Sequence, residues 1–161
     1  MNARAAFGLS VLMSLLSSII VAILFAWPWL RHSNVQQALM WLVAPHMFLR
    51  FIGISFLVPG VVSTSLPKTW AAPAGYGDFV AGILAIIAIV ALAETAAWAV
   101  LAVWIFNLWG VADLLFAFYK GAQVRLEPGS LGAAFYIVTA IVPPLLVSHV
   151  LIFALLLRTS V

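Results

Sequence analysis

Six polar residues that could bind a ligand lie inside stretches that are otherwise apolar. They are His46, Arg50, Asp78, Asn107, Asp113 and His149. Ionisable side chains are rare within a membrane, and by default they indicate a ligand, ion or proton site. An arginine beside aspartates can hold the charged groups of a small molecule, whereas histidines can carry protons or ligate haem iron. Whether the six residues form one site depends on the elements that carry them.

The composition is typical of a membrane protein. The chain has 161 residues, of which 66% are hydrophobic and only 7% are charged, whereas a soluble domain carries roughly a quarter charged residues. Such a chain cannot cover a water-facing surface, so we expect the lipid bilayer around it. The net charge of +3 comes from scattered Lys and Arg residues, and without a basic cluster we expect no nucleic-acid partner. Cysteine is absent, which excludes disulfides and thiolate metal sites.

The hydrophobic pattern predicts an all-α fold, a single polytopic bundle of five transmembrane helices. Roughly 20 apolar residues are needed to cross a bilayer, and five stretches meet or approach that length. The predicted spans are residues 6–30, 35–61, 78–93, 97–119 and 131–157. The first stretch is too long for a signal peptide. Asn34 is the expected N-terminal cap of the second span.

Residues 62–77 are predicted to be the longest non-helical stretch. They include Pro67, Pro73, Gly75 and Gly77, which are residue types that favour turns. The stretch is too apolar for a loop in water, so we expect it to lie on the membrane surface or to dip into the bundle. Asp78 would then open the third helix, either as its N-terminal cap or as a site residue.

The basic residues outside the spans predict the orientation of the chain. One side of a five-span bundle carries Arg4, Lys68, Lys120 and Arg125, and the other carries Arg31 and Arg158. Cytoplasmic loops are richer in Lys and Arg than external ones. We therefore expect the N-terminus in the cytoplasm and the C-terminus outside.

Counting along the spans places the polar residues in two layers. His46, Asn107 and His149 each lie about 15 Å from the outer end of their span, near the middle of the bilayer. Arg50 and Asp113 lie below them at similar depth. They could form a structural ion pair, or Arg50 could hold an anionic ligand group. If these faces converge, they form a polar pocket that opens toward the predicted loop, although Asn107 and His149 could instead serve only as hydrogen bonds between helices.

The sequence resembles a family of small bacterial inner-membrane proteins. The shared pattern is Arg-x-x-Gly, then Pro-Ala-Gly-x-Gly-Asp, then Asn-x-x-Gly-x-x-Asp, and finally a late histidine in a proline-containing helix. The chain matches it at Arg50 with Gly53, at residues 73–78, at residues 107–113, and at Pro143 with His149. The resemblance covers residues 46–150 and implies a bacterial inner membrane and a shared site, but it assigns no activity. His46 lies outside the pattern.

Three kinds of function fit the sequence. In the first, the ligand-binding residues Arg50, Asp78, Asn107, Asp113 and His149 line a pocket that binds or transports a small molecule or a proton. In the second, His46 and His149 are the axial ligands of a b-type haem that carries electrons. In the third, the chain is a structural subunit of a larger membrane complex. The small residues Gly82, Ala85 and Ala88 suit self-association as well as internal packing, so a homo-oligomer also fits the sequence. An intramembrane hydrolase fits worse, because the sequence has no His-Glu-x-x-His motif.

Overall fold

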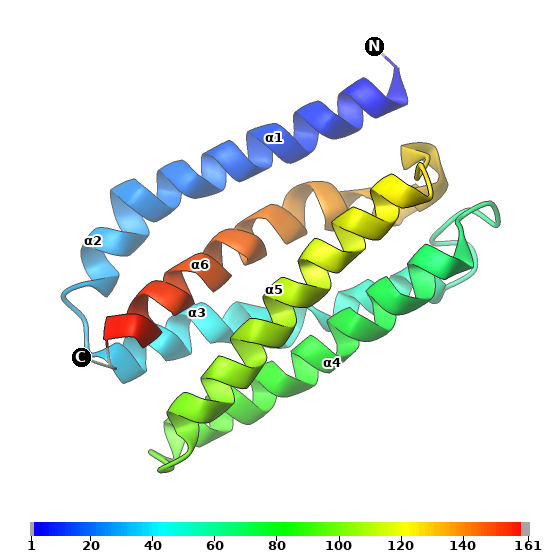
Figure 1. Cartoon of the computed structure of the whole chain (residues 1–161). Helices are drawn as coiled ribbons and strands as arrows, with labels where there is room; N and C mark the ends of the chain where they lie inside the picture. The colour runs from blue at the N-terminus through cyan, green and yellow to red at the C-terminus, as the bar shows by residue number, and fades with distance from the viewer. Residues whose placement is uncertain (1, 159–161) are drawn as a thin grey trace.

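The computed structural model describes residues 2–158, and within that range it is a helical bundle without a β-strand (Figure 1). Five of its helical segments are long and apolar enough to cross a membrane, which confirms the predicted fold class and the number of spans. The elements are α1 (Ala3–Val21), η1 (Ala22–Ala26), α2 (Trp27–Leu30), α3 (Val35–Leu49), η2 (Phe51–Leu57), α4 (Lys68–Ala93), α5 (Ala99–Gln123), η3 (Pro128–Ala134), η4 (Ile137–Ile141) and α6 (Val142–Arg158).

Local sequence signals account for several helix ends. The Asn34 side chain accepts hydrogen bonds from the backbone N–H groups of Gln36 and Gln37, so it caps α3 as predicted. Glu94 and Thr95 form the tight turn after α4, and Thr95 has a φ of 50° there. The Pro143-Pro144 pair lies at the start of α6, directly after the π-helical turn η4. Prolines lack a backbone donor, which favours such an irregular turn just before them.

The third span begins ten residues earlier than the sequence suggested, so the prediction of a non-helical stretch across residues 68–77 was wrong. α4 starts at Lys68, includes Pro73, and has Asp78 in its interior rather than at its cap. The glycines in this segment serve close packing instead of turning the chain. A β-carbon at Gly75 would lie 3.1 Å from the carbonyl oxygen of Gly53, which is tight enough to favour glycine inside a helix.

Other span boundaries shift by smaller amounts. The second span ends at Leu57, in the 3₁₀ segment η2, rather than at residue 61. The fourth runs over residues 99–123 instead of 97–119. The fifth begins at Ile137, because residues 128–134 form the separate 3₁₀ turn η3.

α4 packs against α3, η2 and α5, on the side of the bundle away from α1 (Figure 1). The small residues of its buried face, including Gly82, Ala85 and Ala88, permit these close contacts. α1 lies apart from this core, along α6 and η4 (Figure 1). Only 6% of the most apolar part of the first span is buried, so most of α1 is left to face lipid.

Two apolar clusters fill the interior, one toward each end of the bundle. One contains residues such as Leu39, Val103 and Ile152, and the other contains residues such as Phe56, Leu131 and Leu145. Four segments contribute to both clusters, namely α3 together with η2, α4, α5 and α6. Within each of them, the buried polar residues lie between the part that joins one cluster and the part that joins the other. The packing therefore brings the polar groups of four segments to one level.

Candidate functional site

Arg50 is the centre of the polar level. It lies at the end of α3, is only 1% exposed, and is the largest of the fully buried side chains. Its Nη1 donates to Asp78 of α4, while Nη2 donates to the Gly110 carbonyl at 3.0 Å and to Oδ2 of Asp113 at 3.1 Å, both on α5. The ion pair of Arg50 with Asp113 is one of the two alternatives that the sequence left open. The sequence missed Asp78, because the expected loop placed that residue at the membrane edge.

Three glycines make room for the buried polar side chains of the site. A β-carbon at Gly53 would overlap the Asp78 side chain, and one at Gly77 would overlap the Asp113 carboxylate. A β-carbon at Gly110 would lie 2.5 Å from Nε2 of His149. Three of the four glycines of the sequence pattern, Gly53, Gly77 and Gly110, are therefore positions where a polar side chain of another helix meets the backbone.

His149 is fixed by Asn107 and is completely buried. Its Nδ1 lies 2.7 Å from Oδ1 of Asn107, and Nδ2 of Asn107 donates to the His149 carbonyl at 3.2 Å. Because the amide oxygen can only accept, His149 donates from Nδ1. Asn107 thus joins α5 to α6, which is the interhelical role that the sequence left open beside ligand binding.

His46 is held in a similar way by a neighbour that the sequence did not single out. Ser148 donates to the Leu145 carbonyl at 2.8 Å, and its oxygen lies 2.7 Å from Nε2 of His46. His46 therefore donates from Nε2. Nδ1 of His46 and Nε2 of His149 are buried without a hydrogen-bond partner.

The two histidines do not fit a bis-histidine haem. Their ring centroids are only 4.4 Å apart, and Phe106 packs at 5.0 Å from the His46 ring and 5.2 Å from the His149 ring. A porphyrin would have to lie between two axial imidazoles whose bonds to the iron are about 2 Å each. Here the rings contact each other directly, and neither lines any of the three cavities described in residues 2–158.

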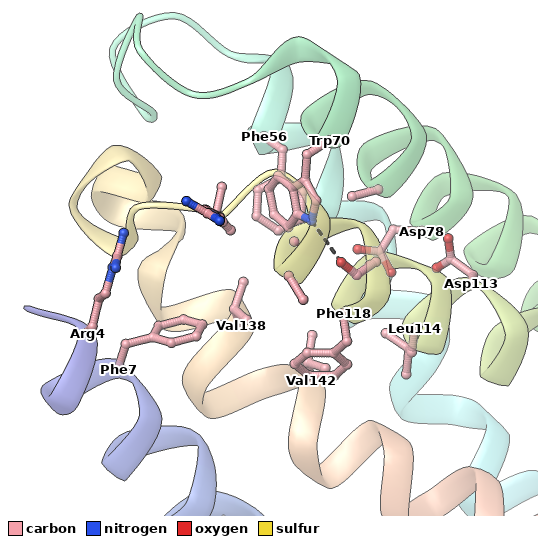
Figure 2. Close-up of a pocket in the computed structure, with 16 residues that line it drawn as sticks. Arg4, Phe7, Phe56, Trp70, Asp78, Asp113, Leu114, Phe118, Val138 and Val142 are labelled. Atoms are coloured by element: carbon pink, nitrogen blue, oxygen red, sulfur yellow. Dashed lines mark hydrogen bonds between the residues drawn. The ribbon is translucent and has the colours of Figure 1, made fainter.

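A cavity of about 400 Å³ lies beside the Arg50 cluster (Figure 2). Asp78 and Asp113 form one end of it, and Arg4 and Phe7 of α1 lie at the other end. Most of the wall between them is apolar, with Phe56, Trp70, Leu114, Phe118, Val138 and Val142 among its residues. This cavity differs from the predicted pocket, because Arg50, Asn107 and His149 do not line it and residues 73–77 belong to a helix rather than to a loop.

The predicted site residues divide into two groups around this cavity. Asp78 and Asp113 line it, whereas Arg50, Asn107 and His149 are buried and do not line it. The sequence missed Trp70, whose Nε1 donates to the Ala117 carbonyl at 2.9 Å and fixes the ring in the wall. The spacing of Trp70, Ala74 and Asp78 places them on one helical face, a signal that becomes visible only once α4 is known to begin at Lys68.

The charges of the cluster do not balance. Two carboxylates face one guanidinium, so one negative charge remains when both aspartates are ionised. A buried charge is costly unless it is paired. The uncompensated charge lies at the end of the cavity, where a proton or a cationic ligand group could neutralise it.

No curated protein and no solved structure significantly matches this sequence. One family matches, over residues 6–157, which is nearly the whole chain. That range includes Arg50, Asp78, Asn107, Asp113 and His149. The chain thus belongs to the family described as Domain of unknown function (DUF8737).

Proposed function

We propose that this protein binds, inside its transmembrane bundle, a small amphipathic molecule with a cationic end. The cationic end would meet Asp78 and Asp113, and the apolar body would lie among the aromatic and aliphatic side chains of the cavity. The observation that carries this proposal is the pair of carboxylates at one end of a mostly apolar cavity, with the Arg50 guanidinium between them. Arg4 and Arg125 also line this cavity.

The arrangement of Arg50 favours a cation over an anion. The sequence allowed Arg50 to hold an anionic ligand group, but both of its Nη atoms are engaged by protein oxygens and its side chain is 0% exposed. The cavity therefore presents carboxylate oxygens to a ligand, and the guanidinium holds these oxygens from behind. Binding of a cation would neutralise the remaining negative charge without breaking the ion pairs.

The size and walls of the cavity suit a small organic molecule. Its volume of about 400 Å³ falls within the range of roughly 300–1,000 Å³ that is usual for ligand pockets. Mostly apolar walls with a few convergent polar groups are also typical of such sites. Sensing the ligand and transporting it or a proton are two activities that both require binding. We therefore propose binding itself.

The proposed location is the bacterial inner membrane, with the N-terminus in the cytoplasm. The resemblance in sequence supports the inner membrane, and the excess of Lys and Arg on the side of Arg4 supports the orientation. In this orientation the Arg4 end of the cavity lies on the cytoplasmic side.

Matched single-chain compounds test the proposal. We would measure thermal unfolding of the protein in nanodiscs with decyltrimethylammonium, decanol or decyl sulfate, and would identify co-purifying molecules by mass spectrometry. We expect only the cation to stabilise the protein, because it can pair with the two carboxylates. At a hundred times its Kd, a ligand adds about 2.7 kcal/mol to the free energy of unfolding. Asp113→Asn should abolish this stabilisation.

Glu94→Gln is the matched control, because Glu94 is an exposed carboxylate in the turn after α4 and does not line the cavity. It should retain the full response to decyltrimethylammonium. Equal stabilisation by decanol, or an unchanged response in Asp113→Asn, would contradict the proposal.

A further inference from the structure

A second cavity lies on the opposite side of Asp113, between α4 and α5. It has a volume of about 540 Å³, and we call it the α4–α5 groove. Tyr76 and Val80 of α4 line it together with Trp109 and Phe116 of α5. The three aromatic residues are well exposed: Tyr76 is 59% exposed, Trp109 45% and Phe116 44%. Because these residues lie within two membrane spans, the groove faces lipid.

Asp113 is shared between the groove and the inner cavity. Its Oδ2 accepts from Arg50 at 3.1 Å, and its Oδ1 lies against Gly77, where a β-carbon would overlap it. The Gly77 carbonyl accepts a hydrogen bond at 3.2 Å from Nε1 of Trp109, which holds that ring in the groove. The carboxylate thus separates two cavities and lines both of them.

The depth of the groove narrows the choice of ligand. Asp113 lies ten residues before Gln123, the last residue of α5, so it is about 15 Å from that end of the helix. Headgroups of bilayer lipids stay at the interface, outside a hydrocarbon core about 30 Å thick. A carboxylate among exposed aromatic rings at this depth is complementary to a lipophilic organic cation, by charge and by cation–π attraction.

We propose that the α4–α5 groove is a second binding site, the lipid-side entrance through which a lipophilic organic cation reaches Asp113 and then the inner cavity. This inference rests on the proposed function, because it supplies the route to the same carboxylate. A ligand that partitions into the bilayer would bind first among Tyr76, Trp109 and Phe116. It would then meet the Asp113 carboxylate, which lines both the groove and the inner cavity.

Stopped-flow binding of decyltrimethylammonium to the protein in nanodiscs tests this route. Val80→Trp fills the groove without touching the inner cavity. We expect its association and dissociation rates to fall about ten-fold together, while Kd stays within about two-fold, because a blocked path raises the barrier in both directions. Ala112→Phe narrows the groove from the α5 side and should slow both rates in the same way.

Ile87→Trp is the matched control. Ile87 is an exposed aliphatic residue seven positions beyond Val80 on α4, and it lies outside the groove. It should leave both rates unchanged. Unchanged rates in Val80→Trp and Ala112→Phe would overturn the inference. It would also be overturned if the wild-type protein were a dimer and these variants made it a monomer without changing the rates. If the wild-type protein bound no decyltrimethylammonium at all, the proposed function itself would fail.

Discussion

Arg50 has two carboxylate partners on different helices, and this redundancy has a measurable consequence. Asp78→Asn or Asp113→Asn alone leaves one carboxylate to neutralise the guanidinium. The double variant leaves a fully buried arginine without a counter-charge, and an uncompensated buried charge costs about 3–5 kcal/mol. We therefore expect the double variant to lose far more free energy of unfolding than the sum of the two single variants. Reversible unfolding in mixed micelles would measure all three.

Strict additivity of the two substitutions would contradict this reading of the cluster. It would mean that each aspartate contributes separately and that neither takes over from the other as the partner of Arg50. Arg50→Ala together with Asp113→Ala provides a further comparison. This double variant should not recover wild-type stability, because it leaves Asp78 buried without its arginine.

At the level of single residues, the sequence predicted the costly groups but not all of their partners. Intramembrane charges usually pair with one another, which was enough to suggest the contact of Arg50 with Asp113 beside the alternative of an anionic ligand. Ser148 could not be assigned to His46 in the same way. A serine can satisfy itself on its own helix, and only the rotation of α6 about its axis decides what else its oxygen meets.

At Gly77 and Gly110 the helices of this bundle approach one another closely because glycine permits it, so small additions at these positions should be costly. Gly77→Ala and Gly110→Ala each place a methyl group into a side chain of a neighbouring helix, Asp113 or His149. Overpacking of this kind costs about 1–3 kcal/mol. We expect both variants to lose stability in that range, as measured by unfolding in mixed micelles.

Gly8→Ala is the matched control for these variants. Gly8 also lies inside a helix, but nothing would lie within 4 Å of a β-carbon there. Alanine is the better helix former by about 1 kcal/mol, so Gly8→Ala should be neutral or slightly stabilising. A loss in Gly8→Ala as large as that in Gly77→Ala would show that the helical context, rather than the contact with Asp113, makes glycine necessary.

The element that the sequence misread is the first third of α4. Pro73, Gly75 and Gly77 are turn-forming residues in water, and local preference alone predicts a loop there. Inside the bundle, Gly75 and Gly77 serve contacts with residues of η2 and α5 that are far away in the sequence. Such contacts override local propensity, and they cannot be seen before the packing partners are known. The error also hid the helical face shared by Trp70 and Asp78.

At the scale of the whole molecule, composition and span length were sufficient to predict a five-span bundle with polar residues at mid-depth. The level between the two apolar clusters contains His46, Asn107 and His149, which the depth count placed in one layer, and also Arg50, which it placed in a layer below. The position of the cavity was not predictable in the same way. It depends on where α1 lies against α6 and η4, and α1 has no charged residue within its apolar stretch that would fix its neighbours.

The five spans also place the two ends of the bundle on opposite sides of the membrane, and the absence of cysteine makes this testable by labelling. One end carries the ion pair of Arg4 with Glu127, and at the other end Arg158 donates to the Arg31 carbonyl. Single cysteines can be placed in exposed positions at each end, as Ser65→Cys and Gln123→Cys or as His32→Cys and Glu94→Cys.

With the N-terminus in the cytoplasm, an impermeant maleimide added to intact bacterial cells should label His32→Cys and Glu94→Cys. Ser65→Cys and Gln123→Cys should react only after the membrane is permeabilised. The cysteine-free wild-type chain is the blank. The opposite pattern would keep the bundle but reverse its orientation, and would place the Arg4 end of the cavity outside the cell. Labelling of Ser65→Cys and Gln123→Cys from different sides would contradict the five-span topology itself, because α4 and α5 would then no longer form an antiparallel pair of spans.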